Sequence, residues 1–292
     1  MGTVFLNGKF LPLEQATVSP LDRGFVFGDG VYEVIPVYGG RLFRLEEHLI
    51  RLDGSLAGIR LASPHTHAEW TRILRELVEH NHGGDQSVYL QITRGVAKRD
   101  HAFPRDCVPT VFAMSSPLAP IPAEIRQTGI AAITLPDIRW QYCHLKTIAL
   151  LPNILLRQQA LDNGAAEAIL IRDGEATEGA ASNLFIVRNE TLLTPPKGPR
   201  LLPGITRDLI LELAAHHGIA QREAVITRDD LAAADEIWLS SSTKEILPVT
   251  RLDGKVVGGG TPGPLWRRMI DWYQDYRRAY QTHGDTLHGS AR

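Results

Sequence analysis

Three prolines within six residues divide the chain into two halves. Residues 115–122 read Ser-Ser-Pro-Leu-Ala-Pro-Ile-Pro, with prolines at positions 117, 120 and 122. Proline fixes its own φ and disfavours helix in the residue before it, so this run is stiff and extended and continues neither a helix nor a central strand. We therefore predict an N-terminal domain over residues 1–116, a linker over residues 117–122 and a C-terminal domain over residues 123–292.

The composition restricts the classes of partner. The chain has 292 residues, which agrees with about two domains, and its 43% hydrophobic and 22% charged residues are typical of soluble globular proteins. A net charge of −2 gives no long-range attraction to nucleic acid or an anionic membrane, so an anionic ligand must be bound by local groups. The two cysteines, Cys107 and Cys143, make no disulfide framework. We expect no membrane span, no signal peptide and a cytoplasmic location.

The N-terminal half alternates strand and helix patterns. Asn7-Gly8-Lys9 is typical of a hairpin turn, and leucine or isoleucine recurs at helical spacing over residues 45–59. Gly28-x-Gly30 lacks the third glycine of a dinucleotide-binding fingerprint and precedes a strand pattern, so it indicates a tight bend. We expect strands at residues 3–6, 10–13, 31–38, 41–44, 88–93 and 109–114, and helices at residues 45–59 and 70–82.

The C-terminal half has a similar alternation. We expect strands at residues 130–138, 167–172, 183–188 and 236–239, and helices at residues 148–162, 205–218 and 265–280. The polar tail from Gln281 is expected to be frayed.

Lys146 is the chain's most distinctive titratable residue. Of six lysines, the other five lie in turns, loops or polar segments, whereas Lys146 precedes Ile148-Ala149-Leu150-Leu151. A lysine in an apolar stretch is either a core-edge residue whose amine reaches solvent or a partly desolvated amine suited to Schiff-base chemistry. Residue type alone favours a core-edge lysine whose amine reaches solvent. Glu178 follows about thirty residues later, in a predicted turn region beside Gly179.

Several segments are suited to anions, and each also has a plainer structural explanation. Arg51 lies beside the apolar stripe of its helix, where a surface role is the default and anion binding the alternative. Leu202-Pro203-Gly204-Ile205-Thr206 begins a helix and is either a simple N-cap or an anion site. Residues 240–243, Ser-Ser-Ser-Thr, either cap a turn or bind phosphate oxygens. Arg99-x-His101 supplies a guanidinium and a second donor for a carboxylate, the alternative being solvated loop charge.

Other chemistries find no support in the sequence. There is no His-Glu-x-x-His and no Gly-x-Ser-x-Gly motif. The pairs His65/His67 and His80/His82 flank a predicted surface helix without an evident carboxylate cluster, so we predict no metal site.

Together these groups match the requirements of pyridoxal phosphate: a lysine for the aldehyde, an acid for the pyridine nitrogen, and anion sites for the phosphate. The chain resembles the class IV, fold-type IV pyridoxal-phosphate aminotransferases over nearly its whole length. The motifs that carry the resemblance are Gly28-Asp29-Gly30-Val31-Tyr32-Glu33, Glu47-His48-Leu49-x-Arg51-Leu52, Cys143-His144-Leu145-Lys146, Glu178-Gly179-x-x-Ser182-Asn183-Leu184-Phe185 and Gly204-Ile205-Thr206-Arg207.

The resemblance implies a role for each matching residue. Lys146 forms the Schiff base and moves the proton, Glu178 pairs with the pyridine nitrogen, and Leu202 packs against the cofactor ring. The phosphate ligands are Arg51, Ile205, Thr206 and Ser242. The implied fold is α+β, with a small two-layer N-terminal α/β domain and a larger, barrel-like α/β C-terminal domain, the cofactor between them, in a homodimer whose partner completes each site.

The substrate branch follows from the basic loop. Arg99 and His101, with Tyr32 as a third member, are similar to the carboxylate trap of D-amino acid transaminases. We therefore expect transfer of an amino group from a D-alanine-like donor to a 2-oxo acid by a ping-pong route. The alternatives are a branched-chain L-amino acid transaminase, an aminodeoxychorismate lyase and a cofactor-binding protein without turnover. Ala180 and Ala181 stand where such enzymes often carry hydroxyls. We expect fewer hydrogen bonds there, with an effect on the cofactor's electronics or on side-chain preference.

Overall fold

The computed structural model describes residues 2–284 and divides into two compact units. The first unit comprises Met1–Ala119 and Leu145–Leu150, and the second comprises Pro120–His144 and Leu151–Arg292. The division near Ala119 falls within the predicted linker. The sequence pattern assigned everything after residue 122 to the second domain, whereas residues 145–150, which include Lys146, pack with the first unit.

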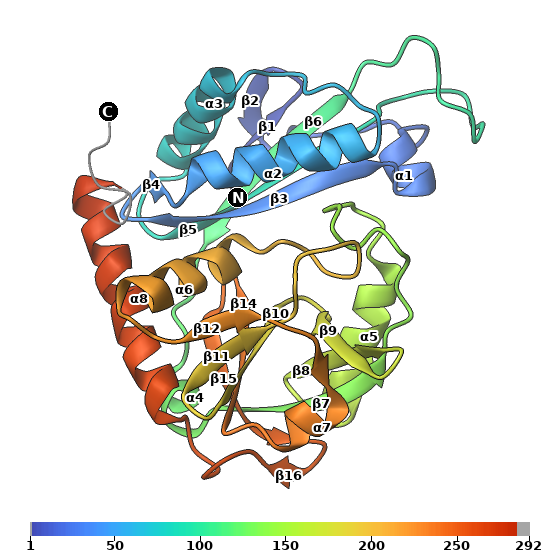
Figure 1. Cartoon of the computed structure of the whole chain (residues 1–292). Helices are drawn as coiled ribbons and strands as arrows, with labels where there is room; N and C mark the ends of the chain where they lie inside the picture. The colour runs from blue at the N-terminus through green and yellow to red at the C-terminus, as the bar shows by residue number, and fades with distance from the viewer. Residues whose placement is uncertain (1, 285–292) are drawn as a thin grey trace. The chain divides into compact units, whose positions relative to one another are not determined.

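The first unit is a six-stranded antiparallel sheet covered by two helices (Figure 1). The strands follow the order β2-β1-β6-β5-β3-β4. Its strands are β1 (Thr3–Leu6), β2 (Lys9–Pro12), β3 (Gly30–Tyr38), β4 (Arg41–Leu42), β5 (Gln86–Thr93) and β6 (Thr110–Pro117), and its helices are η1 (Leu13–Gln15), α1 (Arg23–Phe27), α2 (Leu45–Gly58) and α3 (His67–His80).

Apolar periodicity explains how the helices pack on this sheet. Leu49, Leu52 and Leu56 of α2 are almost fully buried in one core with Val31 and Ile35 of β3. The helix α3 begins at a capping box in which the side chains of residues 66 and 69 bond each other's backbone N–H. At the end of α1, Gly28 adopts φ 68°, a left-handed conformation that favours glycine, so the glycines before β3 form the predicted bend.

The segment Leu145–Leu150 lies along β3. The Tyr32 N–H donates to the Lys146 carbonyl at 2.9 Å, and the Ile148 N–H donates to the Gly30 carbonyl at 3.1 Å. These bonds correct the prediction of a helix from residue 148. The Ile148 N–H is used in the bond to β3 and the Leu150 N–H donates to the Ile148 carbonyl at 2.9 Å, so the helix α5 (Leu151–Asp162) begins only after these residues.

The second unit is built on a curled ten-stranded sheet with the path β12-β11-β10-β14-β15-β7-β8-β9-β13, and β16 beside β15 (Figure 1). Its strands are β7 (Ile130–Pro136), β8 (Glu167–Arg172), β9 (Glu175–Gly179), β10 (Asn183–Arg188), β11 (Thr191–Thr194), β12 (Gln221–Glu223), β13 (Ile226–Thr227), β14 (Glu236–Ser241), β15 (Glu245–Leu252) and β16 (Lys255–Val256), and its other helices are α4 (Ala123–Thr128), α6 (Ile205–His216), α7 (Arg228–Ala232) and α8 (Pro264–His283).

Three more sequence predictions need correction. Glu178 lies within β9 and not in a turn, because the reversal is completed earlier, at Asp173 and Gly174, which both have positive φ. β7 ends at Pro136 and not at residue 138: the Asp137 N–H still donates to the Ile171 carbonyl of β8, while the side chains of Asp137 and Arg139 bond each other. The C-terminal helix continues through residues 281–283, where fraying was expected; the remaining tail lies outside the described residues. None of the described helices is long and apolar enough to cross a membrane.

Candidate active site

Lys146 is held in the first unit by main-chain bonds, which leaves its side chain against an aromatic ring. Its N–H donates to the Ser55 hydroxyl at 3.1 Å, and its carbonyl accepts from Tyr32. The Lys146 ammonium lies 4.2 Å from the centroid of the Tyr32 ring. The ring of Tyr32 in turn contacts Tyr89, with centroids 5.6 Å apart. The amine is therefore presented from a short, well-bonded segment beside the tyrosine that the sequence predicted as a substrate residue.

Arg51 is bound to Glu33 and does not lie on the open surface, the default that residue type suggested. Arg51 donates from Nε to Glu33 Oε1 at 2.8 Å and from Nη2 to Glu33 Oε2 at 2.7 Å. The Glu33 side chain is fully buried and that of Arg51 is 8% exposed. His48 completes the group, with Nδ1 2.8 Å from Glu33 Oε2. The bidentate pair fixes the plane and direction of the guanidinium.

The protonation states of this group follow from burial and charge. Burial opposes ionisation of Glu33, but Arg51 and His48 outweigh it and hold the pKa of that carboxyl well below its usual range. Burial lowers the pKa of His48, against the attraction of Glu33, and the positive charges of Arg51 and Lys146 lower it further. An ionised Glu33 only accepts hydrogen bonds, so the neutral imidazole donates from Nδ1.

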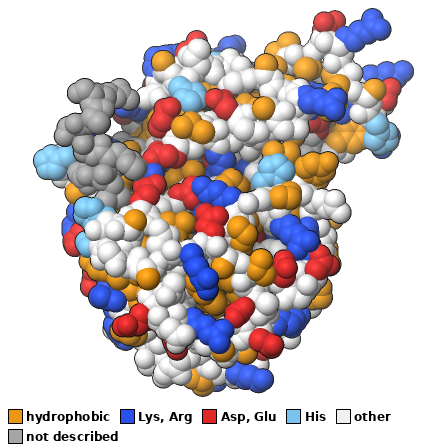
Figure 2. Space-filling view, in the orientation of Figure 1, with side chains coloured by type: hydrophobic (Ala, Val, Ile, Leu, Met, Phe, Trp, Pro, Cys, Tyr) orange, Lys and Arg blue, Asp and Glu red, His pale blue; other side chains and the backbone are white. Residues whose placement is uncertain are grey.

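Arg99 and His101 lie together on the exposed loop between β5 and β6, as the sequence predicted. Figure 2 shows cationic side chains gathered where this loop projects in Figure 1. The Arg99 guanidinium lies 5.4 Å from the centroid of the Phe27 ring, and the His101 ring lies 5.4 Å from the same ring. The two side chains thus share one aromatic support, while Tyr32 contacts Tyr89 and Lys146 instead.

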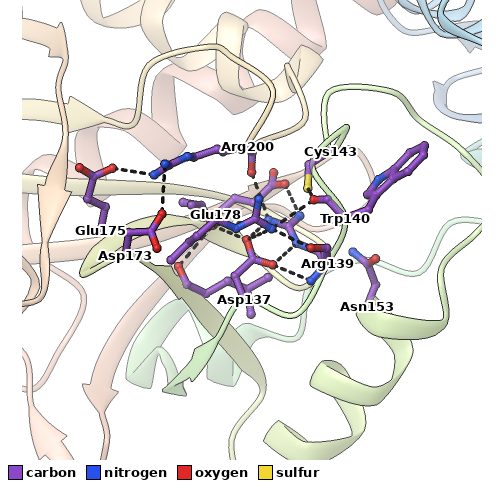
Figure 3. Close-up of polar contacts among 12 residues, drawn as sticks. Asp137, Arg139, Trp140, Cys143, Asn153, Asp173, Glu175, Glu178 and Arg200 are labelled. Atoms are coloured by element: carbon purple, nitrogen blue, oxygen red, sulfur yellow. Dashed lines mark hydrogen bonds and ion pairs between the residues drawn. The ribbon is translucent and has the colours of Figure 1, made fainter.

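Glu178 is a buried carboxylate of the second unit with donors on both oxygens (Figure 3). Its Oε1 accepts from Arg139 Nη1. The Leu202 N–H lies 3.2 and 3.1 Å from the two oxygens, and Asn183 Nδ2 donates to Oε2 at 3.0 Å. Burial raises the pKa of Glu178 to about 7, although Arg139 and the Leu202 N–H favour the ionised form.

Arg139 is a site residue that the sequence patterns did not predict. Its guanidinium joins Glu178 to Asp137, with Nε and Nη2 at 2.9 Å from Asp137 Oδ1 and Oδ2. Arg172 reaches the same Asp137 carboxylate at 3.0 Å. The available signal was an acid and an arginine flanking Ile138 at the end of a strand pattern. Glu33 was missed as well, although its place beside Tyr32 in a motif was visible.

Two of the phosphate residues suggested by the resemblance, Ile205 and Thr206, form the start of α6. Gly204 precedes α6, and no side chain caps the N–H groups of that helix. A Cβ on Gly204 would collide with the Asn183 amide, which explains the glycine. Asn183 also donates to the Leu202 carbonyl at 2.8 Å, so it ties this loop to β10. The Ile205 and Thr206 N–H groups and the helix dipole are therefore arranged to receive an anion.

Ser242 lies in the tight turn between β14 and β15, and its side chain is partly exposed. Ala180 is anchored through its backbone: its carbonyl accepts from Asn153 Nδ2 at 2.8 Å and its N–H donates to the Ala168 carbonyl at 3.1 Å. The missing hydroxyls at Ala180 and Ala181 therefore remove side-chain bonds without disturbing this main-chain anchor.

One histidine departs from the sequence expectation. His67 has carboxylates at both ring nitrogens, with Asp53 Oδ2 at 2.8 Å and Glu46 Oε1 at 3.1 Å. These acids raise the pKa of His67, partly offset by desolvation. Within residues 2–284, no group of three or more histidine, cysteine or acidic side chains could hold a metal ion.

The residues present fit pyridoxal phosphate. Lys146 offers an amine, the buried Glu178 offers a carboxylate for a ring nitrogen, and the uncapped start of α6 suits a phosphate. Residues 30–252 match the family described as amino-transferase class IV. The chain belongs to this family. The α+β fold and the cofactor class expected from the sequence are thereby confirmed.

Relatives of two substrate classes resemble this class IV aminotransferase. It is 41% identical over 266 residues to a D-alanine aminotransferase of Bacillus licheniformis, covering 91% of this chain and 94% of that protein. Among solved structures, the branched-chain amino acid aminotransferase of Escherichia coli aligns with TM-score 0.90 and 29% identity over 97% of this chain and 96% of that one. The branched-chain enzyme of the archaeon Thermoproteus uzoniensis, solved with norvaline, aligns with TM-score 0.88 and 27% identity over 97% of both chains.

Proposed function

We propose that this class IV aminotransferase transfers the amino group of a D-amino acid, such as D-alanine, to a 2-oxo acid by a ping-pong route. The observation that carries the proposal is the 41% identity to a D-alanine aminotransferase over 91% of the chain. The Arg99/His101 pair supports it chemically, because a guanidinium with a second donor suits the α-carboxylate of an amino acid.

Bound pyridoxal phosphate supplies an aldehyde that the amino group can join and a ring that accepts electron density from the substrate's α-carbon. Lys146 would take the proton from the α-carbon as general base and deliver it to the bound cofactor as general acid. Its position over the Tyr32 ring, 4.2 Å away, directs the amine. A Lys146→Ala variant should therefore lose turnover and the visible absorbance band of the bound cofactor.

The remaining residues hold and polarise the cofactor. Glu178 would pair with its ring nitrogen, and Arg139 is ion-paired with the Glu178 carboxyl. Leu202 packs against the ring. The phosphate is bound by Arg51, Ser242 and the N–H groups of Ile205 and Thr206, where the dipole of α6 favours a negative charge.

Arg99, His101 and Tyr32 bind the substrate carboxylate. The part of the chain before the proline linker thus determines substrate specificity. Glu178 and the phosphate residues of the second unit bind the cofactor. The location that we propose is the cytoplasm, in agreement with two unpaired cysteines.

The working form that we propose is a homodimer whose partner completes each site. In its support, α5 exposes three large apolar side chains at helical spacing: Leu151, Ile154 and Leu155 are 66%, 60% and 54% exposed. A surface of this kind fits a second copy of the chain. Light scattering should give twice the chain mass for the wild type, and Ile154→Glu should shift it toward monomer. Val225→Glu, at a residue 53% exposed outside α5, is the matched control.

A branched-chain L-amino acid transaminase is the second candidate, favoured by the TM-score of 0.90 to the Escherichia coli enzyme. Aminodeoxychorismate lyase and a cofactor-binding protein without turnover come after it. A panel of D- and L-amino donors with pyruvate or 2-oxoglutarate as acceptor separates these outcomes. Turnover of D-alanine with 2-oxoglutarate and none of L-leucine supports the proposal. Turnover of L-leucine alone contradicts it, and turnover of no amino donor favours the last two.

A further inference from the structure

Arg23 is a buried arginine that bonds the exposed loop on either side of His101. Arg23 as a whole is only 4% exposed to solvent. Arg23 Nη1 donates to the Asp100 carbonyl at 2.6 Å and to the Ala102 carbonyl at 3.3 Å, while Nε donates to Asp29 Oδ2 at 2.8 Å. The Arg23 guanidinium therefore links Asp29, inside the unit, to the backbone of a loop whose other groups are mostly exposed to solvent.

The same short helix also supports the side chains of that loop. Arg23 begins α1 and Phe27 ends it. The Phe27 ring contacts both Arg99 and His101, and the Arg23 guanidinium lies 4.9 Å from its centroid. Backbone bonds from Arg23 and ring contacts from Phe27 thus act on the same stretch of the loop, on main chain and side chains respectively.

A second arginine makes the base of this arrangement rigid. Arg94 bonds both oxygens of Asp29, at 2.8 and 3.0 Å, and stacks 3.8 Å from the centroid of the Phe103 ring. Asp29 is consequently held between two guanidinium groups. Since Arg94 anchors Asp29 independently, loss of Arg23 should free the middle of the loop without leaving the carboxylate unpaired.

We propose that Arg23 is a positioning residue for substrate carboxylate binding: it fixes the backbone at Asp100 and Ala102 and so holds Arg99 and His101 in their binding geometry. The proposal rests on the carboxylate-binding role proposed above for these two residues. A cationic pair on a free loop would have to be ordered at each binding event, and that entropy cost would weaken substrate binding.

Two variants of Arg23 test the proposal in the holoenzyme. Arg23→Gln removes the positive charge and the planar guanidinium with its N–H donors. Arg23→Lys keeps a positive charge beside Asp29 but has no planar guanidinium to bond the two carbonyls. Both should raise the KM for D-alanine about tenfold, with kcat within about threefold of wild type, as for a residue that supports a binding group. Lys98→Gln, which removes an exposed cation from the same loop, is the control and should leave KM within about twofold.

Hydrogen exchange measures the loop without relying on turnover. A peptide covering residues 99–103 should exchange faster in both Arg23 variants than in wild type, and peptides of α2 and β3 should be unchanged. Uniform acceleration through the unit would indicate general destabilisation and overturn the proposal. Unchanged exchange of residues 99–103 would overturn it as well.

A double-mutant comparison locates the effect. In an Arg99→Ala/His101→Ala background, adding Arg23→Gln should change kcat/KM for D-alanine by less than about twofold, because its only route of action has been removed. A further tenfold loss would contradict the proposal. If the wild type fails to turn over D-alanine, the proposed function fails, whereas faster exchange of the loop in the Arg23 variants would still demonstrate its anchoring.

Discussion

Glu33 and Arg51 form a buried ion pair with two hydrogen bonds, of 2.8 and 2.7 Å, that fixes the guanidinium proposed to bind the cofactor phosphate. His48 bonds the same carboxylate at 2.8 Å, so the acid is held by three donors from α2. The direction of Arg51 is therefore set by a residue on a different element, β3.

Replacing Glu33 with Gln should weaken cofactor binding. The amide cannot accept both bonds from Arg51, so the guanidinium loses its fixed plane, and we expect the cofactor Kd to rise about 10- to 100-fold. Fluorescence titration of the cofactor-free protein with pyridoxal phosphate measures this. Glu47→Gln, at a partly exposed acid on the same helix, serves as control. An unchanged Kd in Glu33→Gln would show that Arg51 needs no such support.

Two arginines of the second unit each contact two acidic side chains, one in a buried and one in an exposed setting, so replacing each of them compares the two settings for stability. Arg139 joins the buried Asp137 and Glu178, and Arg200 joins the exposed Asp173 and Glu175 (Figure 3). Arg139→Met leaves the buried Glu178 without its counter-charge and Asp137 with Arg172 alone, and it should lower the free energy of unfolding by about 3–5 kcal/mol. Arg200→Met should cost less than about 1 kcal/mol. Urea unfolding of both variants decides this, and equal losses would refute a special role for Arg139.

Glu178 should make stability depend on pH in the cofactor-free protein. Its pKa is raised from 4.5 to about 7, so between these values the folded chain keeps a proton that the unfolded chain has released. The Glu178 contribution to the free energy of unfolding should therefore fall as pH rises from about 4.5 to 7 and be constant outside that window. Relative to Glu178→Gln, the wild type should lose on the order of 3 kcal/mol across it.

The control for this pH effect is Glu175→Gln, an exposed acid on the same strand. Urea unfolding of the wild type and both variants across this pH range measures the effect. A flat difference for Glu178→Gln would show that its carboxyl keeps an ordinary pKa in the folded protein.

Arg99→Ala should raise the KM for D-alanine and lower kcat/KM while the absorbance band of the bound cofactor remains. The loss of a charge-assisted carboxylate contact is expected to cost about 1.5–3 kcal/mol, or roughly 10- to 150-fold in kcat/KM. Steady-state kinetics and the absorption spectrum together test this. If the band disappears along with activity, Arg99 acts on the cofactor site instead of the substrate.

Local patterns predicted much of this molecule because local physics determines them. Asn7-Gly8 forms the expected hairpin turn with positive φ at both residues, and α2 follows its leucine spacing closely. The helix predicted from residue 205 begins there as α6, so Ile205 and Thr206 lie in its first turn. The helix boundary at residue 148 was missed because contacts beside β3, distant in sequence, outweighed a continuous apolar pattern.

The charged partners could not be predicted because they come from distant elements. Glu33 meets Arg51 18 residues away, and Arg139 meets Glu178 39 residues away. A sequence shows each charge but not which one is buried beside it. The surface interpretation of Arg51 failed for this reason: its exposure depends on an acid of β3 that helix periodicity does not reveal.

Single-turnover mixing of the holoenzyme with D-alanine, in the absence of any 2-oxo acid, tests the central claim most directly. We expect one pyruvate released per active site, with conversion of the cofactor's absorbance band, and no keto acid from L-leucine under the same conditions. Release of one keto acid per site from L-leucine, with none from D-alanine, would contradict it.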